Sequence, residues 1–359
     1  MSFAFSAAEI AQLRAGLLDW YDREGRTLPW RIRPEDRAAG RTADPYRVWL
    51  SEIMLQQTTV PHATPYYAKF LELFPTVHDL ARAPRETVMA AWAGLGYYAR
   101  ARNLHACAQT VARDFGGQFP NTEAELLSLP GVGAYTAAAI AAAAFDRPAN
   151  VVDGNVERVI TRLFALEAAL PRAKPEIRRL AGTLVADDRP GDYAQALMDL
   201  GATVCTPRQA RCGACPWSIW CRARAEGAPE RFPIKEKKQP KPVRYGVVFW
   251  IEATGGVWLR RRPDQGLLGG MAELPGTPWR DQPWTEAEAR IQAPLSAAWS
   301  VSPGQVRHVF THFALELAVW RAAAPAGFAL AGGWRQPVTA LKDAGLPSVM
   351  AKAVKTALG

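Results

Sequence analysis

The stretch Val48-Trp-Leu-Ser-Glu-Ile-Met-Leu-Gln-Gln57 places a single acid, Glu52, inside an apolar run. This pattern predicts a buried helix, with Gln56 one turn from Glu52 on the same face. A buried carboxylate costs several kcal/mol unless it is paired or protonated. A neutral glutamic acid is a proton donor at neutral pH, which is one reason to bury it. The alternative is a solvated or hydrogen-bonded glutamate on an ordinary helix.

Length and composition indicate a globular protein of at least two domains. The chain has 359 residues, of which 49% are hydrophobic, and no apolar run approaches the roughly 20 residues of a membrane span. The segment Met1 to Trp20 lacks the basic start and apolar middle of a signal peptide. We therefore expect a soluble cytoplasmic protein. The net charge of +9 fits a polyanionic partner, although a basic soluble enzyme would have it too.

The sequence divides into three regions. Residues 1–228 are rich in Ala, Leu and Arg with helical periodicity, which predicts an all-α domain. Residues 229–243 are rich in Pro and Lys, which predicts an extended linker. Residues 244–359 change to a pattern that predicts an α+β domain. Its expected elements are strands at Tyr245–Glu252, Val257–Arg261, Val306–Phe313 and Leu315–Trp320, and a closing helix at Pro347–Leu358.

Four cysteines, Cys205, Cys212, Cys215 and Cys221, follow a C-x6-C-x2-C-x5-C spacing. Two disulfides so close together are not expected in a cytoplasmic chain, so the spacing indicates metal binding. Structural zinc usually uses two separated pairs, whereas one short loop of four thiolates is typical of a [4Fe–4S] cluster. The loop has no acid, and its arginines offset the charge of a thiolate-bound cluster. Zinc remains the alternative, and a redox role stays open.

The segment Leu126–Ala138 reads as helix, tight turn and helix. Its turn, Pro130-Gly131-Val132-Gly133, lets backbone N–H groups project outward at the start of the second helix. That geometry binds a phosphate through amides and the helix dipole. It positions a nucleic acid without reading its sequence. Gly131, Val132 and Gly133 are therefore candidate phosphate-binding residues.

A second acid, Asp153, follows two valines and precedes a glycine in Asn150-Val-Val-Asp-Gly-Asn-Val-Glu-Arg158. Taken alone, it reads as the N-cap of a helix. Paired with Glu52, it suggests a sharper interpretation. In glycoside hydrolysis, one carboxylic acid protonates the leaving group and one carboxylate stabilises a cationic sugar.

Together these segments resemble the helix-hairpin-helix DNA glycosylases of the endonuclease III superfamily, and within them the MutY-type adenine DNA glycosylases. The resemblance covers nearly all of residues 6–225, in order, with Arg33–Asp44 as an apparent surface insertion. The matching stretches are Leu28-Pro-Trp-Arg31, Pro45–Thr58, Gly94-Leu-Gly-Tyr-Tyr-Ala-Arg100, Leu129–Tyr135, Val152-Asp-Gly-Asn-Val156, Gln195-Ala-Leu-Met-Asp-Leu-Gly-Ala202 and the four cysteines.

The resemblance implies a role for each matching residue. Glu52 would protonate adenine N7, and Asp153 would stabilise the sugar cation, electrostatically or through a transient adduct. Tyr135 and Asn155 would position Asp153, the sugar or the attacking water. The adenine pocket would comprise Arg26, Leu28, Trp30, Arg31 and Gln195. Gln57, Leu95 and Tyr97 would wedge into the duplex, with core packing as the alternative for Leu95 and Tyr97.

The second domain resembles the Nudix-like domain of this family, through Gly266-Leu-Leu-Gly-Gly-Met-Ala-Glu-Leu-Pro-Gly276. The segment Trp279–Arg290 lacks the run of glutamates of the hydrolase box, so we expect recognition without nucleotide hydrolysis. The segment Arg307–Phe313 resembles the loop that contacts 8-oxoguanine. Phe310, Thr311 and His312 stand at its usual Phe-Ser-His, and Thr311 keeps the hydroxyl.

The resemblance implies base excision repair of adenine opposite 8-oxoguanine or guanine in double-stranded DNA. We expect a monomer associated with the nucleoid. Bifunctional relatives carry a lysine nucleophile where this chain has Tyr135, so base removal without a lyase step is implied. Two alternatives remain. One is a bifunctional glycosylase and lyase for oxidised pyrimidines, and the other is a non-catalytic protein that binds DNA or transfers electrons.

Overall fold

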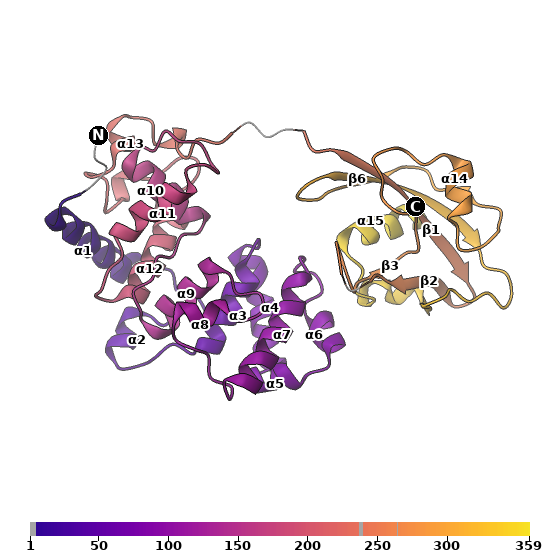
Figure 1. Ribbon diagram of the computed structural model, residues 1–359, viewed down its shortest axis with the longest axis horizontal. Coiled ribbons are helices and arrows are strands. Elements are labelled where there is room, and N and C mark those ends of the chain that lie inside the picture. Colours follow the sequence, from indigo (N-terminus) through magenta and orange to yellow (C-terminus); the bar gives the residue numbers. More distant parts are fainter. Residues whose placement is uncertain (1–4, 237–239, 264) are drawn as a thin grey trace. The chain divides into compact units, whose positions relative to one another are not determined.

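The computed structural model describes residues 5–236, 240–263 and 265–359. The chain divides into two compact units, Met1–Ala83 with Asn103–Lys237 and Pro84–Arg102 with Lys238–Gly359. The N-terminal two thirds of the chain form helices, and the sheet belongs to the C-terminal third (Figure 1).

The predicted all-α character of the first part is confirmed. Its α-helices are α1 (Ala7–Glu24), α2 (Pro34–Ala38), α3 (Pro45–Leu55), α4 (Val60–Leu73), α5 (Val77–Arg82), α6 (Arg85–Ala91), α7 (Ala99–Asp114), α8 (Glu123–Leu127), α9 (Ala134–Phe145), α10 (Gly154–Phe164), α11 (Lys174–Thr183), α12 (Pro190–Asp199) and α13 (Arg222–Ala225). A π-helical turn, η1 (Leu200–Val204), continues α12, and 3₁₀ turns occupy η2 (Cys212–Ala214) and η3 (Pro229–Arg231). The predicted insertion at 33–44 lies mostly at the surface and holds α2.

Side-chain caps fix where the helices begin. The Ser6 hydroxyl accepts a hydrogen bond from the Glu9 N–H at 3.3 Å, and the Ser6 N–H donates to the Glu9 carboxylate at 2.7 Å, so α1 opens with a capping box. Asp44 caps α3 by accepting from the Tyr46 N–H at 2.9 Å. Such caps each stabilise a helix by about 1 kcal/mol. The helix that carries Glu52 therefore has a defined start.

Helices far apart in the sequence pack together in the first unit. The first helix, α1, lies beside α12 (Figure 1), and both contribute to a core that also includes α10 and α11. Close packing of α12 on α9 depends on Gly191, where a Cβ would lie 2.5 Å from the Ala142 carbonyl oxygen. This packing brings the apolar, alanine-rich α9 next to the helices on either side of it, α3 and α12.

The second unit contains a mixed sheet with helices around it. Strands run in the order β3-β2-β1-β6-β4, β5 also pairs with β6, and β7 pairs with β2. The central pair is parallel and aligns Val243–Glu252 with Ala314–Ala323. The elements are β1 (Val243–Ala253), β2 (Gly256–Arg261), β3 (Ala272–Glu273), α14 (Glu286–Ile291), β4 (Ser300–Val301), β5 (Val306–Val309), β6 (Ala314–Ala323), β7 (Gly333–Gln336), the 3₁₀ turn η4 (Val338–Asp343) and α15 (Ser348–Leu358).

Strand β1 is buried on both faces. Val248 and Trp250 belong to the core that α15 covers, while Val247, Phe249 and Ile251 point to a second apolar cluster. Successive side chains of a strand point to opposite faces, so a strand between two layers reads as a continuous apolar run. The α+β class expected for this part is confirmed.

The predicted strands and closing helix are present, with one difference. The segment predicted as a strand over Val306–Phe313 ends at Val309, because the Phe310 N–H donates to the Phe313 carbonyl and closes a turn. The short elements β3, β4, β7 and α14 were not predicted. Two-residue to six-residue elements carry too little periodicity to be recognised in a sequence.

The first half of the predicted linker packs on the first unit. Phe232 is 1% exposed, its carbonyl accepts from Arg162 Nε at 3.0 Å, and the Ile234 carbonyl accepts from the Leu170 N–H at 2.8 Å. Residues 237–239 of the linker lie outside the described residues. Among the described residues, none of the helices has the length and apolar character needed to span a membrane.

Candidate active site

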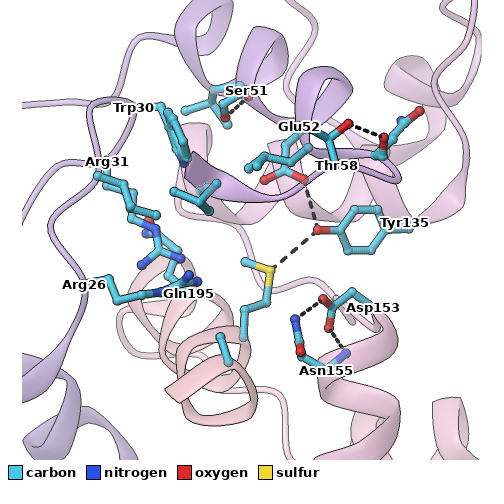
Figure 2. A pocket seen from close by; sticks show the side chains of 18 of the residues that line it. Arg26, Trp30, Arg31, Ser51, Glu52, Thr58, Tyr135, Asp153, Asn155 and Gln195 are labelled. Atoms are coloured by element: carbon cyan, nitrogen blue, oxygen red, sulfur yellow. Dashed lines mark hydrogen bonds between the residues drawn. The ribbon is translucent and has the colours of Figure 1, made fainter. Parts of the chain in front are cut away.

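A pocket of about 420 Å³ opens in the first unit, bounded by α3, α9, α12, the start of α10 and the segment before α2. Its size lies within the roughly 300–1,000 Å³ typical of small-ligand sites. Ten of the candidate site residues line it: Arg26, Leu28, Trp30, Arg31, Glu52, Gln57, Tyr135, Asp153, Asn155 and Gln195. Most of them appear in Figure 2.

Glu52 lies on α3 and is 9% exposed, as expected for a buried acid. The Tyr135 hydroxyl donates a hydrogen bond to Glu52 Oε2 at 3.0 Å, and Figure 2 shows the two side chains pointing toward each other. Burial raises the pKa of Glu52 to about 7, with a smaller contribution from the negative charge of Asp153. The Tyr135 hydrogen bond and the Arg31 charge act in the opposite direction. Glu52 can therefore hold a proton near neutral pH.

Gln56 is the C-cap residue of α3, which ends at Leu55. Its side-chain amide donates to the Thr136 hydroxyl at 3.2 Å and still lines the pocket. The next residue, Gln57, has a φ of 59°. Few residues other than glycine adopt this conformation, and such strain is often found at functional sites.

Tyr135 comes from the first turn of α9. Besides its bond to Glu52, its hydroxyl lies 3.5 Å from Met198 Sδ. Burial raises the pKa of Tyr135 well above its ordinary value, and the charges of Glu52 and Asp153 raise it further. The group therefore stays a neutral phenol that donates to Glu52.

Asp153 is both the N-cap of α10 and a pocket residue, so the two interpretations of the sequence are compatible. Its Oδ1 accepts from the N–H groups of Asn155 and Val156 at 2.9 and 2.7 Å, and its Oδ2 accepts from Asn155 Nδ2 at 2.9 Å. Burial raises the pKa of Asp153 above its ordinary value, while these hydrogen bonds and the Arg158 charge oppose the change. Three donors aimed at one carboxylate hold it in place and favour its charged form.

Asn155 is itself held by a buried arginine. Arg158 Nη2 donates to Asn155 Oδ1 at 2.9 Å and to the Gly201 carbonyl at 2.7 Å, and Arg158 Nε donates to the Cys205 carbonyl at 2.7 Å. Gly201 allows the π-helical turn to approach Asn155, because a Cβ there would lie 2.6 Å from the Asn155 Cβ. These contacts join α10 to the start of the cysteine loop.

Arg26 and Arg31 form the wall of the pocket across from Tyr135 and Asp153 (Figure 2). One acid holds both arginines. Asp199, at the end of α12, accepts from the Arg26 N–H at 2.8 Å, from Arg26 Nε at 2.7 Å and from Arg31 Nη1 at 2.8 Å. Sequence reasoning assigned no role to Asp199. The available signal was its place four residues after Gln195, on the same face of α12.

Trp30 and Gln195 are also buried at the pocket, at 7% and 4% exposure. The Trp30 ring meets the Tyr67 ring edge to face, with 5.2 Å between centroids. The Gln195 amide donates to the Gly191 carbonyl one turn earlier at 3.1 Å. Both side chains therefore have fixed orientations.

The four predicted cysteine ligands line one small cavity with Arg162 and Arg224. Within the described ranges, no three Cys, His, Asp or Glu side chains form a group that could hold a metal ion. The four thiols match the all-thiolate ligand set that would hold a [4Fe–4S] cluster. Arg162 is 1% exposed, with Nη1 3.3 Å from Cys205 Sγ. The donor set and the buried cation fit an anionic cluster.

The hairpin turn has the expected form. Gly131 has a φ of 76°, and a Cβ there would lie 2.6 Å from the Asn103 Cβ. Gly133 caps α9, and a Cβ there would meet nothing within 4 Å. Val132 is 7% exposed and anchors the turn in the core. The space around Gly133 leaves the backbone at the start of α9 accessible.

Leu95 and Tyr97 do not line the pocket and belong to the segment grouped with the second unit. Leu95 is 4% exposed, which matches the core-packing alternative. Tyr97 is 56% exposed and has a φ of 48°. The Arg100 guanidinium lies 5.5 Å from its ring centroid. Of these two candidate wedge residues, Tyr97 is the accessible one.

Phe310, Thr311 and His312 form the turn between β5 and β6 in the second unit. Thr311 and His312 are exposed, whereas Phe310 is partly buried. The Phe310 ring stacks on Trp279, with 5.7 Å between centroids and 29° between planes. The Phe310 carbonyl also accepts from Lys241 Nζ at 2.6 Å. The turn therefore presents two polar side chains on an aromatic base.

Comparisons with known proteins agree with this geometry. Residues 50–185 match the HhH-GPD superfamily base excision DNA repair proteins, and residues 247–356 match the NUDIX domain. The human adenine DNA glycosylase is 37% identical over 387 residues, covering 92% of this chain and 69% of the human protein. The mouse enzyme is also 37% identical, covering 90% of this chain and 74% of its own.

A solved thermostable thymine-DNA glycosylase superimposes with a TM-score of 0.54 at 31% identity. The alignment covers 61% of this chain and 98% of that one. An endonuclease III in complex with DNA superimposes with a TM-score of 0.51 at 21% identity, covering 62% and 99% of the two chains, which supports the fold. The sequence matches, the two domains and the helical fold lead to one conclusion: this chain belongs to the adenine DNA glycosylases of the HhH-GPD superfamily.

Proposed function

We propose that this chain removes adenine paired with 8-oxoguanine, or with guanine, from double-stranded DNA in base excision repair. The observation that carries the proposal is that Glu52 and Asp153 line one pocket in different environments. Glu52 has a pKa of about 7, whereas three hydrogen bonds favour the charged form of Asp153. Two carboxyl groups set apart in this way divide the roles of acid and stabilising anion.

The reaction begins when the adenine nucleotide leaves the base stack and enters the pocket. Glu52 donates its proton to N7 of adenine, and the bond between N9 and C1′ breaks with its electron pair on the base. The sugar becomes an oxocarbenium ion, which the negative charge of Asp153 stabilises. A water molecule then adds to C1′, and its proton passes to the Glu52 carboxylate, which restores the acid. Tyr135 and Asn155 hold the two carboxyl groups in position.

The remaining pocket residues bind the base and distort the duplex. Arg26, Leu28, Trp30, Arg31 and Gln195 form the walls for adenine. Gln57 and Tyr97 enter the duplex beside the lesion, and the strained backbone of each supports this assignment. Leu95 supports the Tyr97 turn from the core.

The enzyme is monofunctional. A lyase step requires an amine that forms a Schiff base with C1′. The residue at the position of that amine is Tyr135, whose phenol is hydrogen-bonded to Glu52. No lysine lines the pocket in the described part of the chain. Treatment of a reacting mixture with borohydride should give no efficient protein–DNA cross-link. Efficient cross-linking would instead favour the bifunctional alternative.

The second unit reads the base opposite adenine. Thr311 and His312 are exposed on the turn after β5 and can exchange hydrogen bonds with 8-oxoguanine.

The Gly131-Val132-Gly133 turn binds a DNA phosphate through its amides. We expect a monomer bound to DNA, with affinity that falls steeply with salt because phosphate contacts dominate.

Cys205, Cys212, Cys215 and Cys221 hold one [4Fe–4S] cluster. The support is the shared cavity, the absence of acids from the loop and the buried Arg162 beside Cys205. The cluster supplies a structural tie for the loop, which Arg158 and Arg162 join to α10. Iron and sulfide analysis should give four of each per chain by this proposal, whereas zinc in the purified protein would contradict it.

The decisive experiment compares two duplexes, one with adenine opposite 8-oxoguanine and one with thymine glycol. We expect rapid release of adenine from the first duplex and no release of thymine glycol from the second. Activity on thymine glycol alone would establish the pyrimidine-specific alternative. Binding to both duplexes without release of either base would favour a non-catalytic protein.

A further inference from the structure

Asp199 is a fully buried acid beside the pocket, and the mechanism above does not use it. Its side chain is 0% exposed and ion-paired with Arg26 and Arg31 at 2.7 and 2.8 Å. Arg31 is 6% exposed and has little water to screen it, whereas Arg26 is 29% exposed. Arg31 and Asp199 are therefore the two charges of this network that water screens least.

Arg31 lies on the pocket wall with Glu52 and attracts its negative form. The other groups that act on Glu52 are Tyr135 from α9 and Asp153 from the start of α10, and Arg26 adds a more exposed cation to the same wall. A cation near a buried carboxyl group favours loss of its proton. An unpaired Arg31 would therefore work against the role proposed for Glu52.

We infer that Asp199 is a positioning and charge-masking residue: by neutralising Arg31, it lets Arg31 line the adenine pocket while Glu52 remains a proton donor near neutral pH. The inference rests on the proposed function, in which Glu52 is the acid. The pKa shifts of Arg31 and Asp199 both favour the charged forms that this role requires. Burial alone would lower the pKa of Arg31 and raise that of Asp199, and their attraction outweighs burial in both.

The test is the pH dependence of single-turnover adenine excision at subsaturating enzyme, which reports ionisations of the free protein. For the parent enzyme, the rate should fall as pH rises through about 7. In Asp199→Asn, unmasked Arg31 should move the midpoint of this fall to lower pH by about one unit. In Arg31→Gln, the midpoint should move to higher pH, because the attracting cation is lost and Asp199 remains.

The double variant Arg31→Gln/Asp199→Asn removes both charges, so its midpoint should lie below that of Arg31→Gln and near that of the parent. This pair of variants carries the test if Asp199→Asn alone fails to fold. Asp192→Asn is the matched control. Asp192 lies on the same helix, is 0% exposed and pairs with Arg189 at 2.9 Å, but does not line the pocket. It should leave the midpoint unchanged.

The two proposals fail in different ways. If the parent shows no fall near neutral pH, Glu52 is not the titrating acid and the proposed function is wrong. If the parent shows the fall but Asp199→Asn lowers the rate equally at every pH, Asp199 has a structural role only and the inference is overturned. Equal midpoints for Arg31→Gln and the double variant would also overturn it.

Discussion

At the scale of single residues, the chemistry of the pocket depends on how many protein hydrogen bonds each carboxyl group accepts. Glu52 has one hydrogen-bond donor in the described structure, Tyr135, whereas Asp153 has three. Burial raises the pKa of both groups, and hydrogen-bond donors oppose this rise, with three of them at Asp153 and one at Glu52. The difference between the two acids is therefore built into their contacts.

Removal of the phenol should make Glu52 a weaker acid. The Tyr135 hydrogen bond lowers the pKa of Glu52, so Tyr135→Phe should raise it. We expect the alkaline fall of the excision rate to move to higher pH, even if the maximal rate decreases. A profile that keeps its midpoint, or moves it to lower pH, would contradict the hydrogen bond's assigned effect.

The substitution Glu52→Gln should stabilise the folded protein although it abolishes excision. The folded pKa of Glu52 is raised from 4.5 to about 7, so the native state binds more protons than the unfolded state between these values. The parent therefore loses stability as pH rises through this window. Glu52→Gln should be more stable than the parent by up to about 3 kcal/mol above pH 7, and the difference should shrink toward pH 4.5. Urea unfolding at both ends of the window measures this, and a pH-independent difference would refute it.

The sequence identified most of these residues but not Asp199. Glu52 was visible because an acid inside an apolar run is unusual, and Asp153 because a second acid completed a known chemistry. Asp199 makes its contacts with residues 168 to 173 positions earlier. Only the folded chain shows such a pairing, and the sequence offers only the indirect signal of its place four residues after Gln195.

At the scale of elements, the turn after β5 depends on an aromatic support. Trp279 stacks on Phe310 and lies over β1, where a Cβ on Gly246 would come within 2.8 Å of its ring. Trp279→Ala should therefore loosen the turn and reduce discrimination between 8-oxoguanine and guanine several-fold. Trp279→Phe should retain most of it.

The matched control for Trp279 is Trp284→Ala, because Trp284 packs against the other face of the sheet. The measurement is the ratio of excision rates for adenine opposite 8-oxoguanine and opposite guanine. An equal loss of this ratio in both alanine variants would indicate general destabilisation and contradict a specific support by Trp279.

Element prediction succeeded where the period was clear and long. The run Val247–Ile251 and the alternating β6 gave recognisable strands, and α15 gave a clear helical pattern. The sequence Val306–Phe313 also alternates well enough to suggest one strand, but the Phe310–Phe313 hydrogen bond breaks it into a turn. That hydrogen bond creates the exposed Thr311 and His312, so the error fell on a candidate binding loop.

At the scale of the whole molecule, the proposed function assigns chemistry and lesion recognition to different parts of the chain. The pocket lies within the first unit, and the Phe310-Thr311-His312 turn lies within the second. Deletion of residues 244–359 should therefore cost discrimination of 8-oxoguanine from guanine more than it costs excision of adenine opposite guanine. Single-turnover rates on both duplexes give the comparison, and equal discrimination with and without these residues would remove the second unit's role.

The whole proposed reaction depends on Glu52 as the proton donor, and one comparison tests this role most directly. Adenine excision from a duplex with 8-oxoguanine opposite adenine should be measured for the parent and for Glu52→Gln, together with binding of the same duplex. Glutamine keeps the shape and the acceptor oxygen but cannot donate a proton to N7 as an acid. We predict loss of excision with binding largely retained. Excision by Glu52→Gln at a rate near that of the parent would contradict the role of Glu52 as the proton donor.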